Sequence, residues 1–383
     1  MRILLIGEYS RLHNSLKEGL LKLGHEVIIV ANSDGFKNFP VDYSIDYSLC
    51  KSKIINIPRQ IIARLFNYDF AKLEQGLRFY FLLKKLKNYD VVQFIHETPI
   101  KTNKKWELFL LNKIFKTNKN VFILSSGADY LNMKFDVENK SKKSVLQPFF
   151  LNPSLIKEYD SLFDYTKESH KKVHDFVMEK CNGIIPTDLD YVDATKNHPK
   201  YLGLIPTPIN LDQLPFKALE IENKIILFLG INEWSYNQKG SQYFEAALEI
   251  IKNKYGDKVE VIIAKTIPYY DYINLYNKAH ILLDQTFSQD QGYNALEAMA
   301  KGKVVFTGAE NEFMEHYNLT ERVAVNAKAD VAYLVKELSF LIENPSEIIA
   351  IGKRARAFVE KEHDYIKIAK RYIEVWGNQP KNN

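Results

Sequence analysis

The chain has 383 residues, of which 46% are hydrophobic and 26% charged, with a formal net charge of +5. This composition is typical of a folded protein and excludes a largely disordered one. The length predicts two domains rather than one. The sequence also lacks an uninterrupted apolar stretch of about 18 residues, so we expect no membrane-spanning helix.

Lysine and arginine residues are concentrated between residues 51 and 143. A basic first half suits an anionic membrane, a phosphate-bearing acceptor or nucleic acid, although a lysine-rich solvated surface is the simpler explanation. Nucleic-acid binding would depend on charge alone, so we expect no nucleic-acid partner. Basic amphipathic helices expected between residues 54 and 87 either face the core or make peripheral contact with an anionic membrane.

Two cysteines, Cys50 and Cys181, match no metal-ligand spacing, and so few cysteines favour a reducing compartment. The charge of Arg2 comes too early for a signal peptide, so the N-terminal segment is expected to be a strand. We therefore expect a cytoplasmic protein, either free or peripheral at the inner face of the membrane.

The first 30 residues predict a strand, a helix and a second strand. Residues 2–6 are apolar, Leu12, Leu16, Leu20 and Leu23 recur at helical spacing, and residues 26–30 are again apolar. This pattern predicts a parallel, doubly wound sheet. A dinucleotide fingerprint needs three glycines after the first strand, and only Gly7 is present, so a nicotinamide cofactor is not expected.

Further strands are expected at residues 90–95, 121–124, 183–186 and 202–206. Ligands of doubly wound sheets bind outside the carboxyl ends of the strands, where polar residues follow three of these strands. His96 is a candidate polar group there, and a histidine that is hydrogen-bonded at a strand end is an equally good explanation. The residues of this group are Gly7, Glu8, His96, Ser126, Gly127 and Asp129.

Asp188 and Asp190 have the spacing of a metal-binding Asp-x-Asp motif. Their position just before a helix fits N-terminal capping instead, so we expect no metal site. Three prolines between Pro206 and Phe216 then form a stiff connector, which is the best domain boundary. A second α/β pattern follows it, with strands expected at residues 224–229, 258–264, 281–284, 304–306 and 321–325.

Residues 284–308 read as a strand end, a polar loop, a short helix and a buried strand. The loop ends at Gly292, the helix is expected over residues 293–301, and Gly302 is a helix stop. A glycine before a helix N-terminus makes an anion site, with Glu297 one turn inside. An ordinary loop–helix–strand connection explains this pattern equally well.

Four segments, taken in order, resemble retaining glycosyltransferases of the GT-B fold that carry a Glu-x7-Glu motif. They are Gly24–Val27, Pro206–Asp212, Gly230 with Lys239–Gly240, and Gln289–Glu297. The resemblance covers nearly the whole chain. It implies two Rossmann-like, doubly wound α/β domains that face a cleft: residues 1–207, completed by a C-terminal helix at 362–378, and residues 208–361.

The resemblance also implies the reaction. A hexose or related sugar would move from a UDP- or GDP-type nucleotide sugar to a glycan, lipid-linked or polysaccharide acceptor. No cofactor or metal is implied, because a lysine and a helix dipole can supply positive charge.

The site residues follow from the same resemblance. Glu297 would bind the ribose hydroxyls, Lys239 would neutralise the diphosphate, and amides near Gly292 would meet the diphosphate or the sugar. The catalytic residues would be Lys239, His96 and Gln289. The donor-binding residues would be Gly230, Asn232, Lys239, Gly240, Gln289, Asp290, Gly292, Tyr293, Asn294 and Glu297, and the residues from Gly7 to Asp129 named above would form the acceptor side.

The sequence departs from the family pattern. Gln289 replaces the first glutamate, Ile231 stands where the family has an arginine, and Ser126 replaces a histidine. Because of these departures, the sequence does not identify the donor sugar, and two alternatives to an active glycosyltransferase remain. One is a non-catalytic relative that acts as a partner or scaffold, and the other is a sugar-nucleotide epimerase of the same fold, for which no acid/base set stands out.

Overall fold

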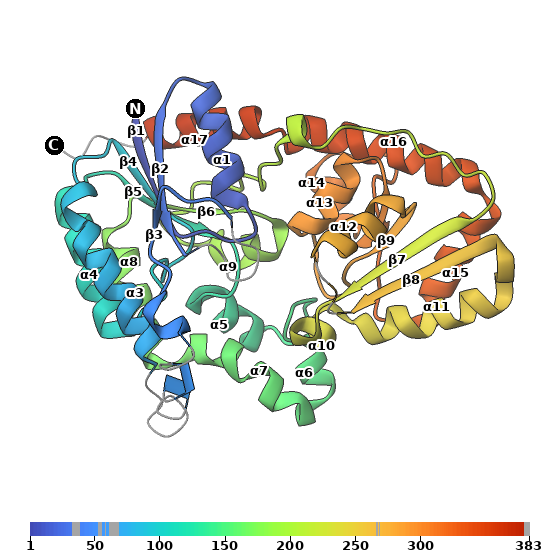
Figure 1. Ribbon diagram of the computed structural model, residues 1–383, viewed down its shortest axis with the longest axis horizontal. Helices are drawn as coiled ribbons and strands as arrows, with labels where there is room; N and C mark the ends of the chain where they lie inside the picture. Colours follow the sequence, from blue (N-terminus) through green and yellow to red (C-terminus); the bar gives the residue numbers. More distant parts are fainter. Residues whose placement is uncertain are drawn as a thin grey trace.

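The computed structural model describes residues 1–32, 39–52, 56–57, 59–60, 69–265, 267 and 269–378. Two α/β domains lie side by side, and each is built on a parallel sheet (Figure 1). Apart from two edge strands, one in each sheet, the strands are almost continuously apolar and buried, as expected for sheets that are covered by helices on both faces.

The first domain contains a six-stranded sheet in the order β3-β2-β1-β4-β5-β6. Its first two strands pair in register from Arg2 with Glu26 to Ile6 with Val30, and all its strand pairs are parallel. The strands are β1 (Arg2–Ile6), β2 (Glu26–Ala31), β3 (Tyr43–Ser44), β4 (Val91–Phe94), β5 (Val121–Ser125) and β6 (Gly183–Pro186).

Helices cover both faces of this sheet. Residues of α3, α4 and α8 form one core with the strands, and residues of α1 and the C-terminal α17 form the other. The helices of the first half are α1 (Leu12–Lys22), α3 (Phe70–Leu82), α4 (Lys104–Thr117), α5 (Tyr130–Glu138), α6 (Gln147–Leu151), α7 (Ile156–Phe163), α8 (Glu168–Lys180) and α9 (Val192–Thr195). Of the basic helices expected between residues 54 and 87, α3 is described, whereas residues 53–55, 58 and 61–68 lie outside the described residues.

The second domain contains a five-stranded parallel sheet in the order β11-β10-β9-β7-β8. Its strands are β7 (Ile225–Ile231), β8 (Val259–Lys265), β9 (Ile281–Leu283), β10 (Val304–Thr307) and β11 (Val325–Asn326). Its helices are α10 (Tyr236–Lys239), α11 (Ser241–Tyr255), α12 (Tyr269–Lys278), α13 (Tyr293–Ala300), α14 (Asn311–His316), α15 (Val331–Glu343) and α16 (Pro345–Glu362).

The chain returns to the first domain at its end. The backbone N–H of Ile209, in the connector, donates to the carbonyl of His363, and that of Tyr365 donates back to Ile209. α17 (Tyr365–Gly377) then packs against α1 (Figure 1). The approach is close, because a Cβ atom at Gly19 of α1 would overlap the carbonyl oxygen of Tyr365.

Three expectations from the sequence are wrong in detail. The strand expected at residues 321–325 is the two-residue β11, Val325–Asn326. Residues 202–206 form no strand, although Leu202 and Ile205 donate backbone hydrogen bonds alongside β6. The strand expected at residues 224–229 extends further and includes Gly230, because the apolar Ile231 continues β7 by pairing with Lys265 of β8. Within the described ranges, no helix combines the length and the apolar content needed to cross a bilayer.

Candidate functional site

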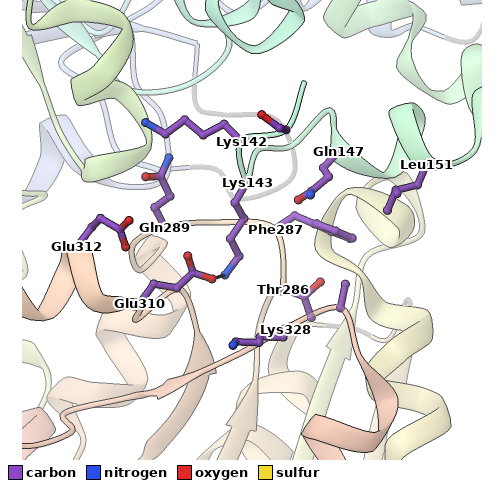
Figure 2. Close-up of a pocket in the computed structure, with 12 residues that line it drawn as sticks. Lys142, Lys143, Gln147, Leu151, Thr286, Phe287, Gln289, Glu310, Glu312 and Lys328 are labelled. Atoms are coloured by element: carbon purple, nitrogen blue, oxygen red, sulfur yellow. Dashed lines mark hydrogen bonds and ion pairs between the residues drawn. The ribbon is translucent and has the colours of Figure 1, made fainter. Parts of the chain in front are cut away.

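A cavity of about 460 Å³ lies between the two domains. The first domain lines it with residues between α5 and the end of α6, and the second domain lines it with the loops that follow β9, β10 and β11. Figure 2 shows Lys143 extending from the first domain towards Glu310 of the second, and the structure gives this ion pair a length of 3.2 Å. Parallel strands end at a common edge, which is why these loops converge.

Lys239 is held at the carboxyl end of β9. Its Nζ donates to Oδ1 of the buried Asp284 over 2.8 Å, while 32% of the lysine side chain remains exposed. Gly240 follows in the left-handed region (φ 69°), where a side chain would overlap Thr286. The backbone N–H of Thr286 donates to the carbonyl of Lys239 over 2.9 Å. The ammonium group is therefore fixed by its backbone and by one carboxylate, with one side open.

Helix α13 begins at Gly292 without a side-chain cap. Gly292 has no side chain that could cap the N–H groups of the first turn, and the positive end of the helix dipole faces the loop. Tyr293, the first residue of α13, contacts the first domain, because its hydroxyl lies 3.2 Å from Oγ of Ser15. The carbonyl of Asn294 accepts from the Tyr276 hydroxyl. Glu297 is partly exposed one turn further along.

The loop before α13 is clasped to the first domain by reciprocal hydrogen bonds. Asp190 accepts from the backbone N–H of Gln289 and from the hydroxyl of Ser288, each over 2.6 Å. In return, Asp290 accepts from the backbone N–H of Leu189 over 3.2 Å. We call Asp188, Asp190, Ser288, Gln289 and Asp290 the interdomain clasp. Both carboxylate oxygens of Asp290 are engaged in it, since the second accepts from the N–H of Gln291.

The clasp gathers three carboxyl groups, of which that of Asp290 is buried and those of Asp188 and Asp190 are partly buried. Asp188 accepts from the backbone N–H of Asp190 and caps the 3₁₀ helix Leu189–Tyr191, as the capping interpretation predicted. Burial, together with Asp190 and Asp290, raises the pKa of Asp188 well above its usual range, and burial raises the pKa of Asp290 to about 7. The cluster therefore retains a proton near neutral pH. No group of three His, Cys, Asp or Glu side chains in the described ranges could hold a metal ion.

On the first domain, the loop after β1 packs against the end of β4. Gly7 has a φ of 89°, and a Cβ atom there would overlap the Ile95 side chain. Glu8 is fully buried and accepts from the backbone N–H groups of Tyr9 and Asn14, so it holds the entry to α1. Gly7 and Glu8, two of the residues predicted on the acceptor side, thus shape this loop.

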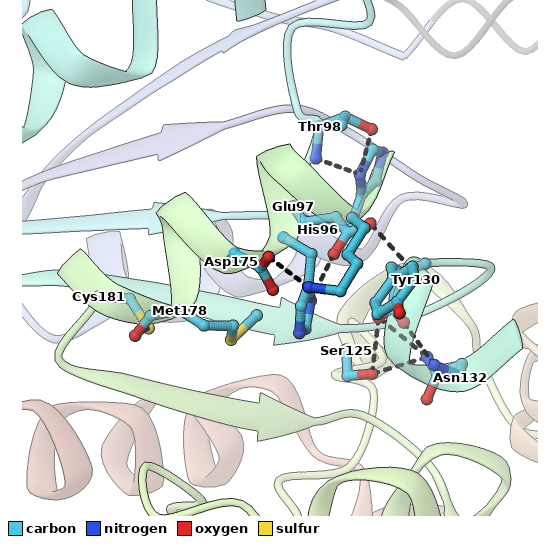
Figure 3. A network of polar contacts seen from close by, with 12 residues as sticks. His96, Glu97, Thr98, Ser125, Tyr130, Asn132, Asp175, Met178 and Cys181 are labelled. Carbon is cyan, nitrogen blue, oxygen red and sulfur yellow. Dashed lines mark hydrogen bonds and ion pairs between the residues drawn. The ribbon is translucent and has the colours of Figure 1, made fainter. Parts of the chain in front are cut away.

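Glu97, directly after His96, is the centre of a buried polar network (Figure 3). It accepts from the backbone N–H of Tyr130, at the start of α5, and lies 2.9 Å from Nδ1 of His174. Asp129 caps α5 and accepts from Ser125 and Asn132. Burial and the neighbouring Glu97 raise the pKa of Asp129 to about 7.

Ser126 and Gly127 complete the loop after β5. The hydroxyl of Ser126 donates to the carbonyl of Ile95 over 2.7 Å, and the carbonyl of Gly127 accepts from the side chain of Asn132. The Ser126 bond joins the loops after β4 and β5, and the Gly127 bond joins the β5 loop to α5. The six residues predicted on the acceptor side therefore gather at the carboxyl edge of β1, β4 and β5.

His96 presents a neutral ring. Its Nδ1 accepts from the backbone N–H of Thr98 over 3.0 Å. Burial, with Lys101 and Lys104 nearby, lowers the pKa of His96 well below its usual range. Because Nδ1 is the acceptor, the ring proton resides on Nε2. His96 can therefore donate a hydrogen bond from Nε2 at neutral pH.

The donor-side residues gather on the second domain. Asn232 caps the short turn after β7, and Gly230, within β7, packs against the ring of Tyr272. Lys239 and Gly240 adjoin the end of β9, and the residues from Gln289 to Glu297 form one continuous loop and helix. Gln289 lines the interdomain cavity (Figure 2). Lys239 and His96 do not line it.

Sequence reasoning missed several residues that build the site. Asp284 directly follows the apolar strand β9, and Glu97 lies three residues after the end of β4. A carboxylate near the carboxyl end of a strand is a signal that could have found both residues. Asp190 was identified only as a helix-start residue, since its partners lie about a hundred residues away. His174 lies on a helix face, where the local sequence gives no sign of its role.

The comparisons with known proteins address the fold and the second domain. A model of the family described as glycosyl transferase-like matches residues 236–374, which include Lys239 and α13. None of the curated proteins matches the chain in sequence.

Solved structures resemble nearly the whole chain at low sequence identity. Sucrose-phosphate synthase from Thermosynechococcus elongatus is 14% identical with a TM-score of 0.61, covering 98% of both chains. Anabaena HepE in complex with UDP and glucose is 12% identical with a TM-score of 0.58, covering 99% of this chain and 100% of that one. UDP-GlcNAc 2-epimerase from Neisseria meningitidis, bound to UDP-GlcNAc, is 12% identical with a TM-score of 0.52, covering 98% and 99%. The expected GT-B architecture, two parallel-sheet α/β domains, is confirmed.

Proposed function

We propose that the protein is a glycosyltransferase that moves a hexose or related sugar from a UDP- or GDP-type nucleotide sugar to a glycan, lipid-linked or polysaccharide acceptor. One observation carries the proposal: the Lys239 ammonium and the uncapped N-terminus of α13 lie in the segment that matches the glycosyl transferase-like family. Both are positive groups that suit a diphosphate.

The donor would bind on the second domain. Negative charge grows on the diphosphate as the glycosidic bond breaks, and positive groups fixed in advance stabilise that charge most effectively. Asp284 would keep Lys239 in place without neutralising its open side. Glu297 would accept hydrogen bonds from the ribose hydroxyls, and the backbone amides of Gly292, Tyr293 and Asn294 would meet the diphosphate or the sugar.

The acceptor would bind at the carboxyl edge of the first domain. His96, with its proton on Nε2, would donate a hydrogen bond to an acceptor or sugar oxygen. Gly7, Glu8, Ser126, Gly127 and Asp129 would shape the surrounding loops. Retention of the anomeric configuration is part of the proposal through the resemblance to retaining enzymes, in which a donor phosphate oxygen takes the acceptor proton.

Gln289 and Asp290 would have different roles. The Gln289 side chain lines the cavity, and its amide can bond a sugar hydroxyl without adding charge. Asp290 would act through the clasp, because both of its carboxylate oxygens accept backbone hydrogen bonds. The clasp would thus set where the Gln289 side chain points.

A sugar-nucleotide epimerase is the second candidate, favoured by the structural likeness to the Neisseria enzyme. Epimerisation needs an acid and a base at one carbon atom. Two carboxyl groups of the site have pKa values raised to about 7, those of Asp129 and Asp290, and both are engaged in hydrogen bonds within the protein. The transferase proposal needs no such pair and therefore fits better.

Nucleotide binding tests the proposal. Calorimetric titration with UDP, GDP and their sugar conjugates should give binding that Lys239→Met weakens at least ~10-fold, since charge-assisted bonds contribute about 1.5–3 kcal/mol. Lys224→Met is the matched control: Lys224 pairs with Asp257 just before β7, at the opposite edge of the same sheet, and its loss should leave binding unchanged. Absence of nucleotide binding by the wild type would favour a non-catalytic partner instead.

A further inference from the structure

An apolar and basic surface covers α3 and α4. Its exposed apolar residues are Leu77, Tyr80 and Phe81 on α3 and Phe109 on α4, and Phe81 is 75% exposed. In Figure 1 these helices lie on the side of the first domain that faces away from the second domain. We call this surface, with the lysines described below, the α3–α4 face. It is separate from the interdomain cavity, which residues of α3 and α4 do not line.

The apolar residues are fixed by helix geometry. Leu77, Tyr80 and Phe81 are spaced i, i+3 and i+4, so they share one side of α3, while Phe79 is buried in the core. The Tyr80 ring stacks on Phe109 with centroids 6.2 Å apart, and Trp106 meets both rings edge-on. The aromatic rings therefore form a rigid ridge on the surface.

Exposed lysines are frequent along α3 and α4 and in the segments that follow them. Between residues 69 and 120, Asp90 is the only exposed acidic residue, whereas eight lysines are exposed. None of the eight forms an ion pair with an acidic side chain of the described ranges, and Lys113 lies over the Phe109 ring at 5.1 Å. They are Lys72, Lys84, Lys85, Lys87, Lys105, Lys113, Lys116 and Lys119.

A solvated charged surface would account for the lysines alone. It does not account for phenylalanine and tyrosine rings exposed among them, because clustered exposed apolar residues mark interaction surfaces. Aromatic rings favour the interface between lipid headgroups and hydrocarbon, and lysines favour anionic headgroups. The combination, with almost no acidic residue, is complementary to a negatively charged bilayer.

We propose that the α3–α4 face binds an anionic lipid bilayer, with Phe81, Tyr80 and Phe109 in the headgroup region and the lysines at the lipid phosphates. The contact would be peripheral and reversible, since it depends on a few rings and on charges that salt screens. The interdomain cavity would remain open to both substrates, because the face lies on the far side of the first domain (Figure 1).

Vesicle flotation tests this proposal. The wild type should bind vesicles of phosphatidylcholine mixed with phosphatidylglycerol, should not bind phosphatidylcholine alone, and should be released by salt. Lys84→Gln with Lys85→Gln should weaken binding roughly five-fold per lysine. Phe81→Ser with Phe109→Ser should weaken it at least ~10-fold by removing the apolar contact. Unchanged thermal melting would show that these exposed substitutions leave the fold intact.

Matched substitutions on the second domain are the controls. Phe340 is 43% exposed, as is Phe109, and Lys252 and Lys258 are exposed lysines. Phe340→Ser with Lys252→Gln and Lys258→Gln should bind vesicles like the wild type. The proposal is overturned if these controls lose vesicle binding as much as the α3–α4 variants do, or if the wild type binds neutral and anionic vesicles equally well. It is also overturned if Phe81→Ser with Phe109→Ser still binds vesicles but no longer self-associates in sedimentation experiments.

Discussion

The carboxylate of Asp190 in the first domain accepts a hydrogen bond from the backbone N–H of Gln289 in the second, with 2.6 Å between Oδ1 and the nitrogen. Its other oxygen accepts from Ser288, also over 2.6 Å. One partly buried side chain thus fixes the start of the loop that leads to α13. The geometry of the proposed donor site therefore depends on the first domain as well as on the second.

Asp190→Ala should destabilise the protein by about 1–3 kcal/mol, because two donors, the buried Ser288 hydroxyl and the partly buried N–H of Gln289, lose their acceptor. Chemical denaturation measures this change in the free energy of unfolding. Ser288→Ala removes one of the two bonds and should cost about 1 kcal/mol. The double variant should cost less than the sum of the single ones, since the two residues interact directly. Strict additivity would contradict the clasp.

Asp188→Asn should make stability less dependent on pH. The folded-state pKa of Asp188 is raised by burial and by Asp190 and Asp290, so the folded protein keeps a proton that the unfolded chain releases above pH ~4. The wild-type free energy of unfolding should therefore fall as pH rises from about 4 towards 7. Asparagine keeps the acceptor for the Asp190 N–H without titrating, so its curve should be flatter.

Denaturation across that pH range measures both curves. Asp160→Asn removes one exposed carboxylate and controls for the change in net charge. An equally steep fall in Asp188→Asn and in the wild type would show that Asp188 does not hold the proton of the clasp.

Gly7→Ala should destabilise the first domain by about 2–4 kcal/mol, because alanine is strained at a φ of 89° and its Cβ would overlap Ile95. Gly127→Ala is the matched control in a neighbouring loop. A Cβ atom there meets nothing within 4 Å, so the change should stay within about 0.5 kcal/mol. Thermal and chemical denaturation compare the two. Equal costs would refute the proposed packing of the β1 loop.

Glu297→Gln should weaken UDP binding about 10-fold, because a neutral amide is a poorer acceptor for ribose hydroxyls than a carboxylate. Titration with 2′-deoxy-UDP sharpens the test. The wild type should bind it more weakly than UDP, whereas Glu297→Gln should discriminate less between the two. If Glu297→Gln still distinguished UDP from 2′-deoxy-UDP as strongly as the wild type does, another residue would have to bind the ribose hydroxyls.

Local patterns in the sequence predicted most of the fold. Apolar runs such as residues 2–6 located the strands, and Gly292 located the start of α13 because a helix boundary depends on nearby residues. The rule that ligands bind at the carboxyl ends of strands brought together the residues of each domain's edge. The prediction of strands from apolar runs failed at residues 202–206, where an apolar segment lies beside β6 but forms no strand.

Contacts between distant segments could not be predicted in this way. Lys239 and Asp284 are separated by 45 positions, and Asp190 and Gln289 by 99. Nothing in the local sequence marks either pair, because each forms only when two loops meet in space. The same applies to Glu97 and His174, whose contact depends on how α8 packs against β4.

The most direct test of the proposed function is transfer itself. The purified protein should be incubated with a panel of UDP- and GDP-sugars, with and without oligosaccharide and lipid-linked acceptors, and the products read by mass spectrometry and NMR. We expect nucleoside diphosphate release that depends on the acceptor, with a new glycosidic bond of the same anomeric configuration as the donor. Conversion of a nucleotide sugar to its epimer without any acceptor would contradict the proposal.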